Sequence, residues 1–230
     1  MIPGGLNSLT VILLLFSLWH ASCALGVRLS LAFFAITAVT SWIFEEAGVV
    51  TGLVYGPYHY TSTLGPWLGS VPVLIPLAWF MMVYPSYILV NLIVDRGPVG
   101  SPGGRGRLVG LALLGALVMA AWDLVVDPIL SGPTFGAWVW ERGGPYYGVP
   151  VQNYVGWIVT TFTVYLVYRL VERRWTPSRA RPSVVSPGRR PGRRQGSGSG
   201  AAWPRRTGVL PTVTRCGASR SRRARPLWVP

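Results

Sequence analysis

Acidic side chains are scarce in this chain of 230 residues, which contains only seven of them. Asp123 and Asp127 are four residues apart, so on a helix they share one face. Burial disfavours the ionised form of a carboxyl group, and a nearby carboxylate does so again, so one member of the pair can act as a general acid. Two plainer interpretations stay open: Asp127 only starts a loop before Pro128, and Asp123 only bonds to a neighbouring span.

A second acidic group is the adjacent pair Glu45 and Glu46. Consecutive residues of a helix point about 100° apart, so at most one of the two faces a shared site, and we expect it to be Glu45. His20 and His59 lie in no metal-binding motif, and we interpret them as polar contacts of a span and a loop. The sequence therefore predicts a carboxylate site without a metal.

Aromatic residues gather in two segments, 49–70 and 130–150. The members are Tyr55, Tyr58, Tyr60, Trp67, Trp138, Trp140, Tyr146 and Tyr147. Such residues form belts at membrane surfaces, but Gly and Pro recur throughout both segments and favour folded caps over a cavity. Aromatic faces also stabilise a passing cation.

Five continuous apolar runs must position these residues. They cover residues 8–25, 29–44, 71–94, 108–126 and 151–171. Each is close to the roughly 20 residues that a helix needs to cross about 30 Å of hydrocarbon. We predict an all-α fold, a polytopic transmembrane helix bundle of about five spans, in which Pro72, Pro76 and Pro85 kink the third span.

Positive charge divides the chain into two parts. Fifteen of the 21 basic residues, all arginines, follow Glu172, whereas residues 1–172 hold six arginines and all seven acidic residues. The net charge of +14 therefore belongs to a tail, and nucleic acid is not an expected partner. We predict a transmembrane domain over 1–172 and a disordered Arg/Pro/Gly-rich tail over 173–230. The tail either contacts anionic lipid head groups or results from translation of a GC-rich gene in a shifted frame.

The arginines near the ends of the apolar runs orient the spans. Arg28 follows the first run, Arg96, Arg105 and Arg107 follow the third, and the fifth is closed by Arg169, Arg173 and Arg174. Arginine favours the cytoplasmic side, so we expect an integral, multi-pass protein of the cytoplasmic membrane. The aromatic segments and most of the carboxylates then lie at its outer face.

Familiar catalytic motifs are missing from the sequence, which contains no GxGxxG, P-loop, GxSxG or DDxxD pattern. We therefore expect chemistry that uses carboxylates and water.

Three blocks carry a resemblance to a known family. They read FEEAGVVTGLVYGPYHYTSTLGPWLGSVPVLIPLAWFMMVYP, AWDLVVDP and WVWERGGPYYGVPVQNYVGW. On these blocks, residues 42–157 resemble the membrane-integral carotenoid biosynthesis protein family, which includes bacterial carotenoid 1,2-hydratases and archaeal bisanhydrobacterioruberin hydratases. The resemblance implies a hydro-lyase that adds water, without a cofactor, across the terminal 1,2 double bond of an acyclic carotenoid end group.

The positions of the carboxylates suggest their roles in such a reaction. We expect Asp123 to protonate the alkene, and Glu45 or Asp127 to orient water and remove its proton, with Glu46 in the same cluster. The residues expected to bind substrate are Trp42, Tyr58, Trp122, Trp140, Tyr146, Tyr147 and Asn153. Of these, Trp42, Trp122, Tyr146 and Tyr147 are expected to line the cavity. Expected partners are an acyclic carotenoid, membrane lipid and, as an open alternative, other enzymes of the carotenoid pathway.

Two other functional classes stay open. A membrane carotenoid cyclase would begin with the same protonation and end with proton loss, and a prenyl elongase belongs to the same enzyme alternative. A non-enzymatic carotenoid or small-molecule transporter is the second class, although inverted repeats typical of transporters are not evident.

Overall fold

The computed structural model describes residues 4–100 and 103–175. Within these ranges five helices are long and apolar enough to cross a membrane. They are α1 (Gly4–Leu25), α2 (Val27–Thr51), α3 (Leu74–Asp95), α4 (Arg105–Leu130) and α5 (Val151–Trp175). The predicted all-α transmembrane bundle is confirmed for this part of the chain. The domain boundary at residue 172 stays a prediction, because the tail from residue 176 onward lies outside the described residues.

Glycine and proline explain where the helices begin and end. Gly26 alone joins α1 to α2, with a φ of +86° that a side chain rarely adopts. The second helix runs past its predicted end at residue 44 and stops at Gly52, whose left-handed conformation caps it. In α3 only Pro85 lies in the helix interior, because Pro72 belongs to a strand and Pro76 to the first turn, where proline is tolerated. The expectation that all three prolines kink the helix is therefore wrong.

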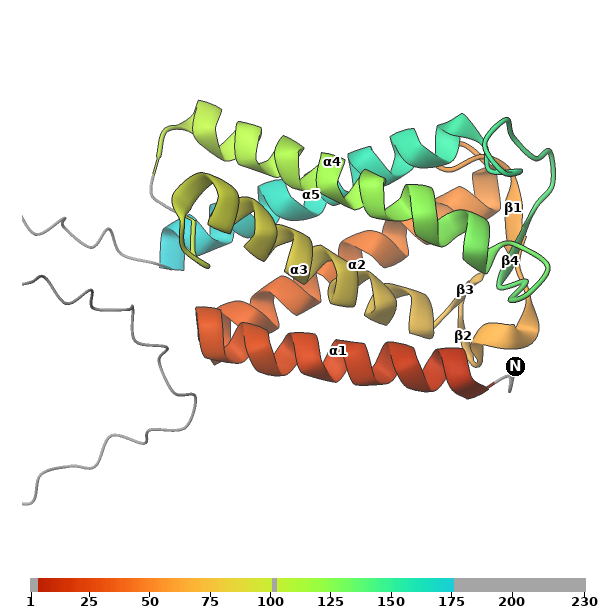
Figure 1. The fold of residues 1–230 in the computed structure, drawn as a ribbon, viewed down its shortest axis with the longest axis horizontal. Coiled ribbons are helices and arrows are strands. Elements are labelled where there is room, and N and C mark those ends of the chain that lie inside the picture. Colours follow the sequence, from red (N-terminus) through yellow and green to blue (C-terminus); the bar gives the residue numbers. More distant parts are fainter. Residues whose placement is uncertain (1–3, 101–102, 176–230) are drawn as a thin grey trace, which may run out of the picture. The chain divides into compact units, whose positions relative to one another are not determined.

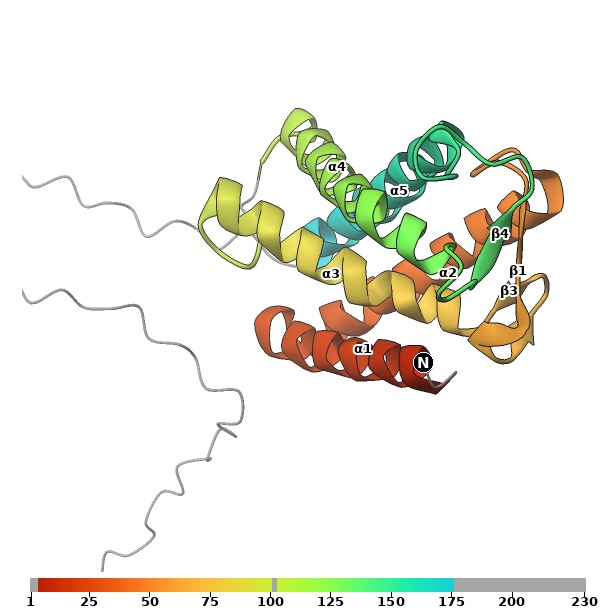
Figure 2. The ribbon, with the colours of Figure 1, turned by 45° about the vertical axis from the view of Figure 1, so that its right-hand side comes forward.

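Successive helices run in alternating directions, so both aromatic segments lie at one end of the bundle (Figures 1 and 2). We call this the strand end, because the four short strands of the described chain lie there. Strand β1 (Tyr58–Tyr60) pairs with β4 (Trp138–Trp140), and β2 (Trp67–Leu68) pairs with β3 (Val71–Pro72), both antiparallel. A single 3-10 turn, Ser62–Leu64, follows β1. The aromatic segments are therefore folded caps and not only a belt.

The middle of the bundle is an aromatic core. Phe33 of α2 stacks on Tyr168 of α5 with ring centroids 3.8 Å apart, and it meets the rings of Phe80 and Tyr87 of α3 edge-on. All four side chains are buried. This packing fixes α2, α3 and α5 relative to one another, and so fixes the ends of these helices at the strand end.

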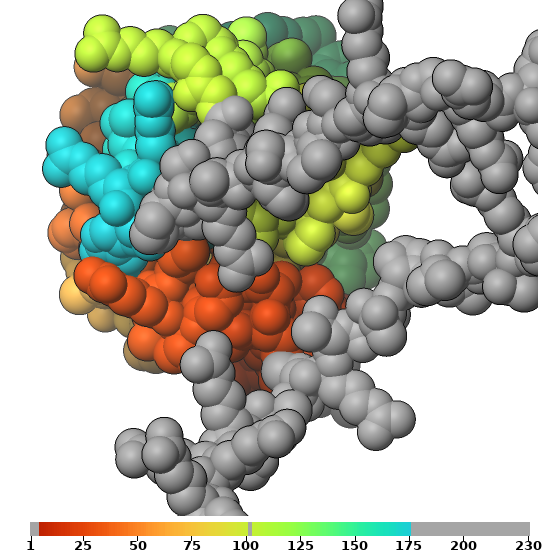
Figure 3. Space-filling model, turned by 90° about the vertical axis from the view of Figure 1, so that its left-hand side faces the viewer, coloured from red at the N-terminus to blue at the C-terminus, as the bar shows by residue number. Residues whose placement is uncertain are grey.

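The opposite end of the bundle, shown in Figure 3, brings together the ends of α1, α3 and α5 and the beginning of α4. Arg169 donates to Asn91 Oδ1 over 2.9 Å and lies above the ring of Tyr87, whose hydroxyl donates to Glu172. Asp95 pairs with Arg107. These buried polar contacts tie α3, α4 and α5 together far from the caps.

Candidate active site

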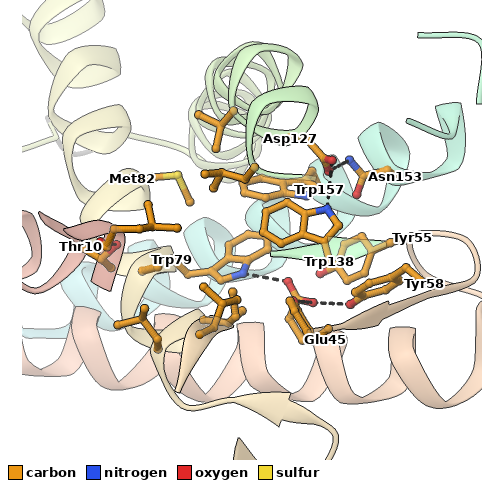
Figure 4. A pocket seen from close by; sticks show the side chains of 18 of the residues that line it. Thr10, Glu45, Tyr55, Tyr58, Trp79, Met82, Asp127, Trp138, Asn153 and Trp157 are labelled. Carbon is orange, nitrogen blue, oxygen red and sulfur yellow. Dashed lines mark hydrogen bonds between the residues drawn. The ribbon is translucent and has the colours of Figure 1, made fainter. Parts of the chain in front are cut away.

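A cavity of about 100 Å³ lies at the strand end, and Figure 4 shows the side chains around it. Its wall combines apolar side chains of α1, α3 and α4 with aromatic and acidic side chains of α2, α4, α5 and the strands. Two carboxylates reach it, Glu45 from α2 and Asp127 from α4. Figure 4 shows them on opposite sides of the cavity, with indole rings between them. The site is therefore a small aromatic chamber with one carboxylate on each side.

The β1–β4 pair supplies most of the hydrogen-bond donors of this chamber. Tyr58 lies opposite Trp140 and Tyr60 opposite Trp138. Alternate residues of a strand point to the same side, so these four rings face the bundle, whereas His59 between them is exposed and lies 3.5 Å from Glu141. The sequences YHY and WVW thus present two phenols and two indoles to the carboxylates below.

Glu45 accepts three hydrogen bonds. The hydroxyls of Tyr58 and Tyr60 donate to its Oε2 over 2.5 and 2.7 Å, and Trp79 Nε1 donates to its Oε1 over 3.0 Å. Burial, reinforced by the charge of Glu45, raises the pKa of both tyrosines well above the usual value of about 10, so they stay neutral donors. The side chain of Glu45 is only 5% exposed. The expectation that Glu45, and not Glu46, faces inward is confirmed.

Asp127 also accepts three hydrogen bonds. Trp138 Nε1 and Trp140 Nε1 donate to its Oδ1 over 3.1 and 3.0 Å, and Asn153 Nδ2 donates to its Oδ2 over 2.8 Å. The helix α4 continues through Pro128 to Leu130, so Asp127 is part of a helix and does not start a loop.

Asp123 lies one turn before Asp127 and is bridged to it. The same amide nitrogen, Asn153 Nδ2, donates to Asp123 Oδ2 over 2.7 Å. The other oxygen of Asp123 is buried and has no hydrogen-bond partner among the described residues. Asp123 is absent from the cavity wall, which includes Asp127 and Asn153. The structure therefore places a pair of carboxyl groups side by side, with only Asp127 in reach of a bound molecule.

Tyr55 is clamped between two helices beside the chamber. A methyl group on Gly48 of α2 would lie 2.7 Å from its ring, and one on Gly156 of α5 would lie 2.5 Å from it. Its hydroxyl shares a 2.8 Å hydrogen bond with Thr160 Oγ1. Both glycines are therefore required by close packing on an aromatic ring that lines the cavity.

Glu46 and Trp42 face away from the chamber. Glu46 accepts from the backbone N–H and the hydroxyl of Ser70 over 2.8 and 3.0 Å, and Trp42 Nε1 donates to the carbonyl of Leu68 over 3.1 Å. Both side chains line a shallow depression on the outside of α2. Glu46 lies about 100° around the helix from Glu45, so it holds the β2–β3 turn and is not brought into the predicted cluster.

Three further residues expected at the cavity lie outside it. Trp122 is 50% exposed on the outer face of α4, because it precedes the inward-facing Asp123 by one residue. Tyr146 and Tyr147 pack edge-on against each other in the loop before α5, and Tyr147 is 80% exposed. The expectation that these three, and Trp42, line the cavity is wrong, and any contact with substrate would be made outside it. Tyr58, Trp140 and Asn153 do line it.

The remaining rings of the chamber include residues that the sequence did not single out for the site. Trp79 of α3 stacks on Trp157 of α5 with ring centroids 4.2 Å apart. Both rings line the cavity, and Trp79 also holds Glu45. His20, expected to be a polar contact within the spans, bonds to the hydroxyl of Tyr84 over 2.5 Å. No group of three or more His, Cys, Asp or Glu side chains among the described residues is arranged to hold a metal ion.

Comparisons with known proteins agree with the resemblance seen in the sequence. A family described as carotenoid biosynthesis protein matches residues 6–187. The bisanhydrobacterioruberin hydratase of Haloarcula japonica is 36% identical over 143 residues, which are 61% of this chain and 45% of that protein. The match thus spans somewhat less than half of this relative. No solved structure matches the chain. Since the family match extends over most of the sequence and through all five helices, the chain belongs to the carotenoid biosynthesis protein family.

Proposed function

We propose that this protein is a hydratase that adds water across the terminal 1,2 double bond of an acyclic carotenoid end group. The observation that carries the proposal is the aromatic chamber with Glu45 on one side and Asp127, coupled to Asp123, on the other. The relative from Haloarcula japonica, which is named as a hydratase, supports the reaction class. The steps below use only a proton and water.

The Asp123–Asp127 pair acts as the acid. Two buried carboxyl groups that accept from the same amide NH₂ group repel each other when both are ionised, so the pair holds one proton. Asp127 faces the cavity and delivers this proton to C2 of the end group, which leaves a tertiary cation at C1. Asp123 stays behind it, where it shares the proton and does not touch the substrate.

Glu45 acts as the base. Its three hydrogen-bond partners, two neutral phenols and one indole N–H, all donate to it, so its carboxylate remains able to accept a proton. A water molecule beside Glu45 attacks C1 as the cation forms, and the resulting oxonium loses a proton to the carboxylate. The product is a tertiary alcohol, and the proton gained by Glu45 balances the one that the aspartate pair gave to carbon.

The aromatic wall stabilises the cation between these two steps. The stacked indoles of Trp79 and Trp157, with Trp138, offer ring faces to the chamber. Ring faces attract cations without acting as nucleophiles, so the intermediate survives until water attacks. At about 100 Å³ the cavity is smaller than the pockets that enclose drug-sized ligands, so it has room for an end group and not for a whole polyene.

The location of the protein is part of the proposal. Within the described residues, the arginines that flank the helices lie at the end of the bundle away from the strands, except for Arg142. The preference of arginine for the cytoplasmic side supports an orientation with the strand end at the outer face of the cytoplasmic membrane.

Expression in cells that accumulate lycopene, grown in water enriched in oxygen-18, tests the reaction. We expect a pigment heavier than lycopene by one labelled water, and loss of this product in Glu45→Gln and Asp127→Asn variants. A product of unchanged mass with a ring at its end would instead establish a cyclase. Unaltered lycopene in cells that contain the folded protein would refute hydration of this end group.

A further inference from the structure

One half of the cavity wall is apolar and includes one side of α3. It is formed by Leu6 and Thr10 of α1, Leu74, Ala78, Met81 and Met82 of α3, and Val126 and Leu130 of α4. Thr10 is the polar member, and its hydroxyl is satisfied by the carbonyl of Leu6 over 3.0 Å. This part of the wall therefore presents apolar surface and no free donor. In Figure 4, Thr10 and Met82 lie across the cavity from Asn153 and Tyr58.

The same face of α3 continues as a stripe away from the cavity. Its residues are Leu74, Ala78, Met81, Pro85 and Leu89, at spacings of three or four that keep them on one side of the helix. All five are at least partly exposed, although their neighbours on the opposite side of α3 are buried. At about 1.5 Å per residue the stripe is roughly 22 Å long, which is most of the hydrocarbon thickness of a bilayer.

The two neighbouring helices leave this stripe uncovered. Helices α1 and α4 each pack against α3 but make no extensive contact with each other. Figures 1 and 2 both show α3 between them. We call the surface that this stripe forms between α1 and α4 the α3 groove. Its first three residues, Leu74, Ala78 and Met81, also line the chamber that holds Asp127 and Glu45.

We propose that this groove binds the polyene chain of the substrate, which reaches the chamber sideways from the lipid. This inference rests on the proposed function, because it names the site that holds the part of the carotenoid too long for the chamber. The groove and the chamber share wall residues, so a polyene lying on α3 would place its end group between the two carboxylates. This is why we expect the polyene to occupy the groove. Met81 and Met82 at the junction have flexible, polarisable side chains that adapt to an extended hydrocarbon.

Ala78 controls access in this arrangement. Its small side chain lies at the junction, one turn after Leu74 and one turn before Met82, and it lines the cavity. A larger side chain at this partly exposed position projects into the groove and does not overpack a buried core. Ala78→Leu should therefore narrow the junction and Ala78→Trp should close it.

Retention of pigment by the purified full chain tests the groove without requiring turnover. The parent protein for this test is the Asp127→Asn variant, produced in lycopene-accumulating cells and purified in detergent. We expect it to retain lycopene, with retention reduced in Ala78→Leu and at least tenfold lower in Ala78→Trp. Leu117→Trp is the matched control, because Leu117 is exposed on the side of α4 opposite Val126, nine residues or about 180° away.

The outcomes separate this inference from the proposed reaction. The proposed polyene site would be refuted if the Ala78→Trp and Leu117→Trp proteins retained equal amounts of lycopene while both were monodisperse and as thermally stable as their parent. It would also be refuted if the parent protein retained lipid in place of pigment. In chains with native Asp127, normal lycopene hydration by Ala78→Trp would also overturn it while leaving the reaction intact. Pigment retention that depends on Ala78 in a protein that adds no water would support the groove and refute the hydratase.

Discussion

Replacing Asp127 by Asn removes the proton that Asp127 can transfer but nearly preserves the shape of the side chain. The amide oxygen of Asn can still accept from Trp138 and Trp140, as Asp127 Oδ1 does over 3.1 and 3.0 Å. Its NH₂ group then occupies the place of Oδ2, 2.8 Å from Asn153 Nδ2, where two donors meet. Rotation of the Asn153 amide by 180° removes this conflict, because its oxygen then accepts from the new NH₂ group at position 127. The same oxygen then faces Asp123, which must be protonated to donate to it.

The magnitude of the effect follows from these contacts. Rearranging one buried hydrogen bond costs about 1–3 kcal/mol of stability. Loss of general acid catalysis costs about 10²–10⁴ in rate, or roughly 2.7–5.5 kcal/mol of barrier at 1.36 kcal/mol per tenfold. The hydration rate should therefore fall by at least about a hundredfold while the protein still folds and still binds pigment. A variant that only disturbed the structure would lose binding and thermal stability together.

The assay measures hydrated carotenoid per amount of purified protein, with thermal unfolding in detergent alongside. Glu46→Gln is the matched control, because Glu46 is also an acidic residue of the strand end but bonds to Ser70 outside the cavity. We expect it to keep the activity within about threefold, as for a peripheral hydrogen bond. Asp123→Asn should lose less than Asp127→Asn, because it does not face the cavity. Normal hydration by Asp127→Asn together with an inactive Asp123→Asn would refute the role of Asp127 as the proton donor.

Three further substitutions or truncations test other parts of the structure. Tyr58→Phe should lower the rate of lycopene hydration about tenfold, because it removes one of the two phenols that donate to Glu45. The double variant with Tyr60→Phe should lower this rate further, and equal rates for the single and double variants would contradict this role. Gly156→Ala should destabilise the protein by about 1–3 kcal/mol, because its methyl group would lie 2.5 Å from a buried ring, whereas Gly110→Ala, with open space around it, should not lower the melting temperature. A stop codon after Trp175 should leave the five helices folded and inserted, as judged by membrane fractionation and circular dichroism, and loss of insertion would show that the tail contributes structure.

The helices and their order were predictable because a membrane span needs only length and apolar composition, and both are local properties. Alternation of direction then brought the ends of α2 and α4 to one side, and the spacing of Asp123 and Asp127 placed them on one face. The angular separation of Glu45 and Glu46 predicts that only one of them faces inward, but it does not say which one; the burial of Glu45 is decided by the packing of α2.

The donors to the carboxylates were not predictable from local pattern. Strands β1 and β4 have three residues each and lie about 80 residues apart, so their pairing leaves no periodic signal that one sequence can show. Trp79 reaches Glu45 only because α3 packs beside α2. Trp122 is next to Asp123 in the sequence but points about 100° away from it, so it lies on the outer face of α4. These are consequences of tertiary packing. The alternation in YHY and WVW is compatible with strands, but three residues are too few to predict them.

The hydrogen-bond donors to the two cavity carboxylates come mainly from the caps. A carboxylate in a membrane-spanning helix is costly unless it is paired or hydrogen-bonded, and here Glu45 and Asp127 each accept three donors. Four of these six hydrogen bonds come from the β1–β4 pair, which lies outside the spans. The caps therefore stabilise the carboxylates in the same geometry that presents them to the cavity, so a change that unfolds the β1–β4 pair should abolish activity before it disturbs the helices.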